Sequence, residues 1–178
     1  MIRPFVVVLL FIAYSTNAHS EGTKPDPWQP VRFLIGNWQG TASGQAGTGT
    51  VTRSYDFILS DRFIQERNMS TYPPQAKKTK GEVHHHLGIL SFDRKRKTVM
   101  LRQFHEESFV NLYALNPAAS KPPILVFESE SFENFDNSWK AKETYEIISD
   151  DEFIETFELA PPGKPFEVYS RNHFKRIP

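Results

Sequence analysis

Three consecutive histidines, His84, His85 and His86, are the most conspicuous chemical feature of the sequence. Side chains alternate between the two faces of an extended strand, so His84 and His86 share one face about 7 Å apart. With His105 from a neighbouring strand, this pair could form a site for Zn²⁺ or Cu²⁺. However, no carboxylate is fixed beside the imidazoles to orient them. We therefore favour the alternative, in which His84 and His86 line a pocket and no metal ligand is assigned.

Charged side chains interrupt otherwise apolar strand faces. Three cases share this pattern: Arg102 in phase with Met100 and Phe104, Glu143 with Trp139, Ala141 and Tyr145, and Glu155 with Phe153 and Phe157. A buried unpaired charge is too costly to tolerate, so these residues either pair inside the protein or face a wet cavity and hold the polar head of a ligand. A one-residue slip in register would instead turn them to solvent. The predicted ligand-binding residues are His84, His86, Arg102, Phe104, Glu143, Tyr145 and Phe157.

Composition argues against several classes of function. The chain has no cysteine, which excludes disulfides, thiolate metal sites and cysteine nucleophiles. Lys plus Arg equals Asp plus Glu at 21 each, so no net positive field attracts nucleic acid. No serine occupies the G-x-S-x-G setting of a nucleophile elbow. The sequence therefore predicts no catalytic residue and favours a binding protein over an enzyme.

Strands must position these side chains. Ten segments combine β-forming residues with turn residues between them: 38–43, 48–58, 62–71, 82–92, 98–104, 109–115, 124–132, 139–148, 153–159 and 166–174. Short connections make neighbouring strands antiparallel. A meander of this length tends to close, because closure removes exposed edges. We therefore predict an all-β protein, a closed up-and-down antiparallel barrel of about ten strands with room for one small ligand.

The residues before the strands predict export and a short approach to the barrel. Arg3, an apolar run over residues 5–14 and small or polar residues 15–18 are typical of a secretory signal peptide. We expect cleavage after Ala18, or alternatively after Ser20. An uncleaved anchor is less favoured, because the run is shorter than the about 20 residues that span a bilayer. The predicted product is periplasmic or extracellular and is not inserted in a membrane.

The predicted domain organisation follows from this cleavage. Residues 1–18 form the signal peptide, residues 19–29 a flexible leader and residues 30–178 the barrel domain. Within the last, residues 30–35 suit a single helical turn with Pro30 at its first position, and Gly36 ends it.

Gly36-Asn37-Trp38, after a helical turn and at the head of a long run of strands, resembles the opening of calycin-superfamily barrels. In that superfamily the Trp closes one end of the barrel, and a basic residue of the last strand packs over it. The resemblance implies a structural closure by Gly36 and Trp38, with Arg171, Lys175 or Arg176 as the basic partner. A cation stacked on an indole face makes such a closure favourable.

Within the calycins, two blocks are similar to the nitrobindin-like haem-binding barrels and their uncharacterised bacterial relatives. Residues 34–44 look like the pattern L-x-G-x-W-x-G-x-G-x-G, with Ala42 in place of one Gly. Residues 80–88 look like G-x-P-x-H-x-E-x-G: His84 falls on the family His, His86 replaces the Glu, and the Pro is lost. The likeness extends over most of residues 33–176, but only these blocks are specific.

Haem is the cofactor that this resemblance implies. It depends on an axial His in the last strand, for which the candidate is His173, with His84 on the distal side. Alternation argues against His173, because Ser170, Asn172 and Phe174 share the apolar-leaning face and His173 then points the other way. Only a bulge in the strand would reverse this. No cofactor is therefore assigned, and haem stays an alternative.

Together these observations predict an exported barrel that binds a small apolar or amphipathic molecule and no nucleic acid. Two alternatives stay open. One is a nitrobindin-like haem protein acting on nitrogen oxides or peroxynitrite. The other is a structural barrel whose interior is filled with side chains and has no cavity. The residues indicate neither the identity of the ligand nor the oligomeric state.

Overall fold

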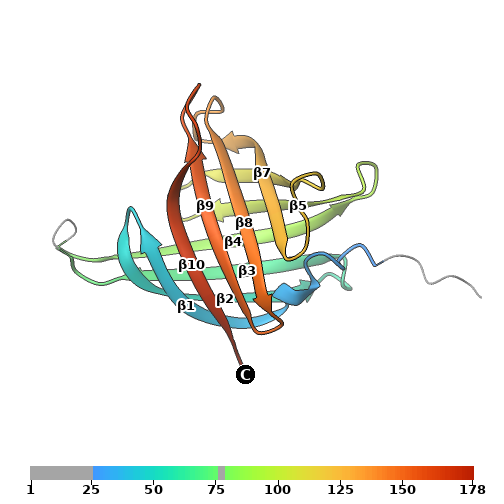
Figure 1. Ribbon diagram of the computed structural model, residues 1–178, viewed down its shortest axis with the longest axis horizontal. Coiled ribbons are helices and arrows are strands. Elements are labelled where there is room, and N and C mark those ends of the chain that lie inside the picture. Colours follow the sequence, from blue (N-terminus) through green and yellow to red (C-terminus); the bar gives the residue numbers. More distant parts are fainter. Residues whose placement is uncertain (1–25, 76–78) are drawn as a thin grey trace, which may run out of the picture.

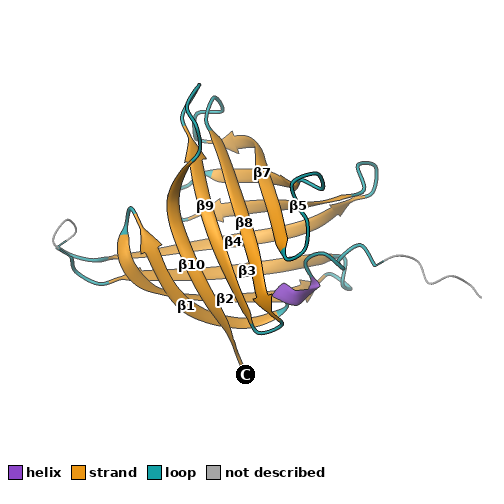
Figure 2. Cartoon of the chain, viewed as in Figure 1, coloured by secondary structure: helices purple, strands orange, loops and turns teal. Residues whose placement is uncertain are grey.

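The computed structural model describes residues 26–75 and 79–178, which form ten antiparallel strands and one short 3-10 turn, η1 (Arg32–Leu34). The strands close into a barrel, in which β1 also pairs with β10 (Figure 1). Their bounds are β1 (Gly36–Gly44), β2 (Gly47–Ile58), β3 (Phe63–Tyr72), β4 (Glu82–Asp93), β5 (Thr98–His105), β6 (Val110–Leu115), β7 (Ile124–Glu133), β8 (Lys140–Ser149), β9 (Glu152–Ala160) and β10 (Glu167–Ile177). Figure 2 shows how far strands dominate the chain. The predicted closed all-β barrel is confirmed, and the predicted strand ends differ from these by no more than three residues.

Alternation between the two faces of each strand explains why this sequence forms a barrel. In β2, Val51, Arg53 and Tyr55 are buried, whereas Thr50 and Thr52, which alternate with them, are exposed. The inward face is polar as well as apolar; in β3 its buried residues are Ile64, Glu66, Asn68, Ser70 and Tyr72. The barrel interior therefore contains ionisable groups that must be paired or must face a cavity.

The meander gives the barrel two different ends. The connections after β1, β3, β5, β7 and β9 lie at one end, called here the open end. The connections after the even-numbered strands lie at the other, the closed end, and η1 enters β1 there. Each strand therefore places some of its side chains near the closed end and others near the open end.

Trp38 seals the closed end. Its side chain is fully buried, and its Nε1 donates a hydrogen bond to the carbonyl of Leu34 at 2.6 Å, which ties η1 to β1. The ring of Phe153 lies edge-on to Trp38 with the centroids 4.7 Å apart, and Phe174 stacks on Phe153 at the same distance. Packed aromatic rings therefore fill the base of the barrel.

Arg176 covers Trp38 from β10. Its guanidinium carbon lies 4.2 Å from the centroid of the indole ring, and its Nη atoms donate to the carbonyls of Ile35 at 2.6 Å and Phe33 at 2.9 Å. Gly36, with φ of +119°, leaves room for it, because a Cβ at this position would lie 2.7 Å from Arg176 Nη1. The packing expected for Gly36, Trp38 and Arg176 is therefore present.

The other two candidates for the basic partner of Trp38 lie elsewhere. Arg171 is exposed and lies 3.7 Å from Glu146, and Lys175 is exposed on the outer face. The prediction that Arg171 helps to close the barrel is wrong, because β10 runs antiparallel to β1. In that register Arg171 pairs with Ser43 towards the open end, whereas Arg176 pairs with Trp38.

The signal peptide predicted for residues 1–18 lies outside the described residues, as do residues 19–25 of the predicted leader. The rest of that leader, residues 26–29, packs against the barrel. Trp28 is buried, its Nε1 donates to the carbonyl of Asp61 at 3.1 Å, and its ring lies edge-on to Phe57. These residues are therefore part of the packed unit. In the described ranges no helix is long and apolar enough to cross a membrane.

Candidate functional site

A cavity of about 610 Å³ occupies the open half of the barrel. Aromatic side chains line it towards the mouth: Phe109, Phe132, Phe135, Trp139, Phe157 and Tyr169. Buried polar side chains line its floor: Arg53, Asn68, Gln103, Glu143, Glu155 and Asn172. The alternative of a filled interior is therefore wrong for this half of the barrel, which combines apolar walls with a polar floor in the manner of small-molecule sites.

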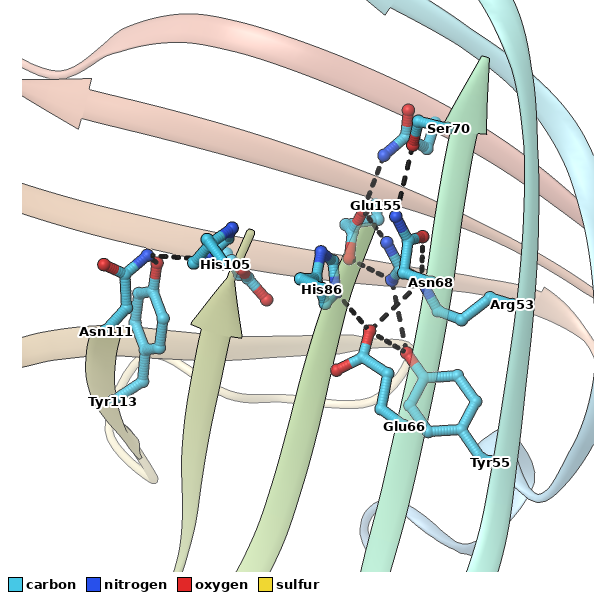
Figure 3. Close-up of polar contacts among 12 residues, drawn as sticks. Arg53, Tyr55, Glu66, Asn68, Ser70, His86, His105, Asn111, Tyr113 and Glu155 are labelled. Carbon is cyan, nitrogen blue, oxygen red and sulfur yellow. Dashed lines mark hydrogen bonds and ion pairs between the residues drawn. The ribbon is translucent and has the colours of Figure 1, made fainter. Parts of the chain in front are cut away.

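Arg53 organises the floor (Figure 3). Its Nη1 and Nη2 donate to the two carboxylate oxygens of Glu155, the second at 3.1 Å. Its Nε donates to Asn68 Oδ1 at 2.9 Å and lies 3.1 Å from Glu66 Oε1, and Nη1 also donates to the Tyr55 hydroxyl at 3.2 Å. Burial disfavours the charge, but the carboxylates keep the pKa of Arg53 well above its ordinary value. All three guanidinium nitrogens thus have protein acceptors.

Glu66 lies beneath this floor, fully buried. Burial alone would raise its pKa, but the positive charge of Arg53 and the interaction with His86 lower the pKa of Glu66 to about 2. Gly88 leaves room for the carboxylate, because a Cβ there would lie 2.2 Å from Glu66 Oε2. This Oε2 accepts no hydrogen bond from any residue that the structure describes. An ionised carboxylate therefore lies buried under the cavity, and one of its oxygens has no hydrogen-bond partner among the described residues.

Glu143 is the second acidic group whose pKa is far from its ordinary value. It is buried on β8, and the Tyr145 hydroxyl donates to its Oε2 at 2.9 Å. Burial and the negative charges of Glu155 and Glu66 raise the pKa of Glu143 to about 8. Near neutral pH, Glu143 therefore keeps its proton while Glu66 is ionised, so two similar side chains are in different states within one network.

Two histidines continue the network towards β5. His86 Nε2 lies 3.1 Å from Glu66 Oε1, which assigns the proton to this nitrogen because an ionised carboxylate can only accept. The ring of His105 lies 5.2 Å from that of His86 and stacks on Phe109 at 4.2 Å. The Nδ2 of Asn111 donates to His105 Nε2 at 3.3 Å. Burial and the proximity of His86 lower the pKa of His105 to about 3, so His105 is neutral.

His84 lies at the rim of the cavity and contacts the carboxylates of Glu82 and Glu107. Its ligand atoms and those of Glu106 and Glu107 lie within 4.8 Å of one another, a spacing that a metal ion could bridge. This set differs from the three histidines, His84, His86 and His105, that the sequence offered as possible metal ligands and to which no metal was assigned. His105 instead stacks on Phe109, deeper in the cavity.

The predicted ligand-binding residues divide into those at the cavity and those outside it. His84, His86, Glu143 and Phe157 line the cavity, and Tyr145 is buried behind it, bonded to Glu143. Arg102 and Phe104 are exposed on the outer face, where Arg102 Nη1 donates to Ser91 Oγ at 3.1 Å.

The inward placement expected for Arg102 and Phe104 is wrong for a physical reason. Val99, Met100 and Leu101 are all buried, so at this point of β5 hydrophobicity does not report which face is inside. Counting every second residue from Met100 therefore leads to Arg102 and Phe104, which lie on the outer face. The residues of β5 that line the cavity are Gln103 and His105.

His173 does not fit the axial position that a haem would require. Its Nε2 lies 2.6 Å from Glu152 on the outer face, and 43% of its side chain is exposed. β10 does contain a register irregularity, between Val168 and Ser170, but it lies before His173. Asn172 is buried and lines the cavity, so His173 keeps its outward direction. The arrangement implied by the nitrobindin resemblance is therefore missing at this residue.

Sequence reasoning missed most of the floor and the Glu66 carboxylate beneath it. Arg53, Glu66, Asn68, Gln103 and Asn172 were not singled out, although each lies in phase with buried apolar residues of its own strand. That phase was the available signal, as for Glu143 and Glu155. What it could not provide is the pairing of residues far apart in sequence.

Comparison with known proteins supports the fold and nothing finer. No family model matches the chain, and no curated protein matches it. Among solved structures, the crystal structure of Rv2717c from M. tuberculosis is similar, with a TM-score of 0.61 and 15% sequence identity, over 86% of this chain and 99% of that one. At such low identity, this likeness shows the shared fold alone.

Proposed function

We propose that the protein binds a small amphipathic molecule in the cavity of the barrel, with the polar end at the floor and the apolar part against the aromatic wall. The observation that carries this proposal is the cavity itself, which joins an apolar upper half to a buried polar network. Burial of the ligand's apolar surface would supply most of the affinity, and the polar floor would fix its orientation.

The proposal includes export, for which the support is the pattern of residues 1–18. Intact-mass measurement of the protein recovered from secreting cells tests it. The expected mass is that of a chain beginning at His19, or at Glu21 if cleavage follows Ser20. A full-length mass would contradict it.

Binding can be tested with the neutral apolar dye N-phenyl-1-naphthylamine, whose fluorescence rises in apolar surroundings. We expect saturable binding of one dye per chain. Ser170→Trp, which adds an indole to a residue lining the cavity, should abolish the signal. Arg171→Trp adds the same group to the next, exposed residue of β10 and should leave it unchanged. Equal binding by both variants would refute a ligand site in the cavity.

The haem alternative has weaker support, because His173 faces away from the cavity. Addition of hemin followed by absorbance distinguishes the two. Binding of an amphipathic ligand predicts no Soret shift that depends on His173. A shift lost in His173→Ala would restore the haem interpretation.

A further inference from the structure

We propose that the polar end of the bound molecule is a cation that donates hydrogen bonds, an alkylammonium group, and that Glu143, Glu155 and Asn172 receive it. This inference rests on the proposed function above and names the chemical class of its ligand. It is more specific than the sequence-based expectation, which names only the polar head of a small apolar or amphipathic ligand.

The state of Arg53 argues against an acidic ligand. Among the described residues that line the cavity, Arg53 is the only Arg or Lys. Its three nitrogens already donate to Glu155, Asn68 and Tyr55, and Glu66 lies beside them. A ligand carboxylate would therefore have to displace a protein acceptor from Arg53 and would meet the charges of Glu66 and Glu155 at the same time.

The floor contains a buried hydrogen-bond acceptor that is available to a ligand with a donor group. Asn172 Nδ2 donates to Glu155 Oε2 at 2.7 Å, which leaves the buried Asn172 Oδ1 without a partner in the described chain. Gln103 is 2% exposed and also lines the cavity. Since a buried polar atom without a partner is costly, Asn172 Oδ1 favours a ligand that donates a hydrogen bond to it.

Glu143, Glu155 and Asn172 together form one patch of the inner wall of the barrel. Glu143 lies on β8, Glu155 on β9 and Asn172 on β10, and Glu155 pairs directly with both Tyr145 and Asn172. Glu143 pairs with Phe157, whose ring lies edge-on to Tyr169. An ammonium at this patch therefore has carboxyl and amide oxygens around it and aromatic surface beside its alkyl chain.

The acidic groups of the network favour a cation. Glu66 and Glu155 share the guanidinium of Arg53, and Glu66 also contacts His86. Burial, and after it the negative charges of Glu155 and Glu66, keep the pKa of Glu143 near 8. An ammonium placed beside Glu143 would favour its ionised form, so binding near neutral pH should release a proton.

Calorimetric titration with n-octylammonium, n-octanol and n-octanoate, which share one alkyl chain, tests the inference. At pH 7.5 we expect octylammonium to bind at least tenfold more tightly than either of the others. In wild-type protein its binding should release protons, seen as a difference in heat between buffers of different ionisation enthalpy. Glu143→Gln should reduce the ammonium preference and abolish the proton release. Glu128→Gln, a matched change at an exposed residue of β7, should alter neither.

The outcomes separate this inference from the function on which it rests. If none of the three compounds binds, the proposed amphipathic ligand is refuted. If octanoate or octanol binds as tightly as octylammonium, ligand binding stands and the cationic head group is refuted. An ammonium preference without proton release, or one that Glu143→Gln does not reduce, overturns the assignment to this patch. The proton release needs no variant, so it decides the matter even if Glu143→Gln fails to fold.

Discussion

Replacing Glu143 by Gln should remove a loss of stability that occurs as the pH rises from 6.5 to 8. The pKa of Glu143 is about 8 in the folded protein, against an ordinary value of 4.5. Between these values the unfolded chain has lost the proton and the folded one has kept it. Folding stability therefore falls as pH rises, by about 1.4 kcal/mol per pH unit. Gln has nearly the same shape, stays neutral and can still accept from Tyr145.

His105 determines where this loss becomes visible. Its pKa is about 3 in the folded protein against an ordinary 6.5, so its contribution makes stability rise with pH over that interval. The two slopes oppose each other from pH 4.5 to 6.5. From pH 6.5 to 8 the slope of Glu143 is no longer opposed, and one and a half pH units give a loss of about 2 kcal/mol.

Urea unfolding at fixed pH, followed by tryptophan fluorescence, measures this directly. Wild type and the exposed control Glu128→Gln should both lose about 2 kcal/mol of unfolding free energy from pH 6.5 to 8, and Glu143→Gln should lose little. If Glu143→Gln falls as steeply as wild type over this interval, the buried, protonated state of Glu143 is refuted.

Other substitutions test the network and the closed end by the same unfolding measurement. Arg53→Met should cost about 3–5 kcal/mol, because it leaves Glu66 and Glu155 buried without their cation; a cost below about 1 kcal/mol would contradict the pairing. Arg176→Ala should cost about 2 kcal/mol through the lost contact with the Trp38 ring and two lost carbonyl bonds, whereas the exposed Arg171→Ala should stay within about 0.5 kcal/mol; equal effects would refute the closure. Gly88→Ala should cost about 1–3 kcal/mol by crowding the Glu66 carboxylate, and no measurable loss would mean that Glu66 can move away.

The barrel was predictable from the sequence because its determinants are local. Strand faces alternate with period two, and the turns between strands carry their own residue preferences. The closing role of Trp38 was implied by another local feature, the likeness of Gly36-Asn37-Trp38 to the opening of calycin-superfamily barrels. The basic partner of Trp38 could not be predicted. The choice between Arg171 and Arg176 depends on the register of β10 against β1, which the sequence does not show.

The site was harder to predict because it depends on pairings between distant strands. Arg53 and Glu155 lie on β2 and β9 and meet only when the barrel closes. Three consecutive residues of β5 are buried just before the exposed Arg102. Hydrophobicity therefore does not reveal which face of this strand points into the barrel. Glu143 was found because its strand, β8, alternates regularly.

A crystal structure of the protein grown with n-octylammonium tests the central claim most directly. We predict electron density for the alkyl chain along the aromatic wall of the cavity, with the nitrogen within hydrogen-bonding distance of Glu143 and of Asn172 Oδ1. A cavity that holds only water at saturating ligand, or a ligand bound only on the outer face of the barrel, would contradict the account.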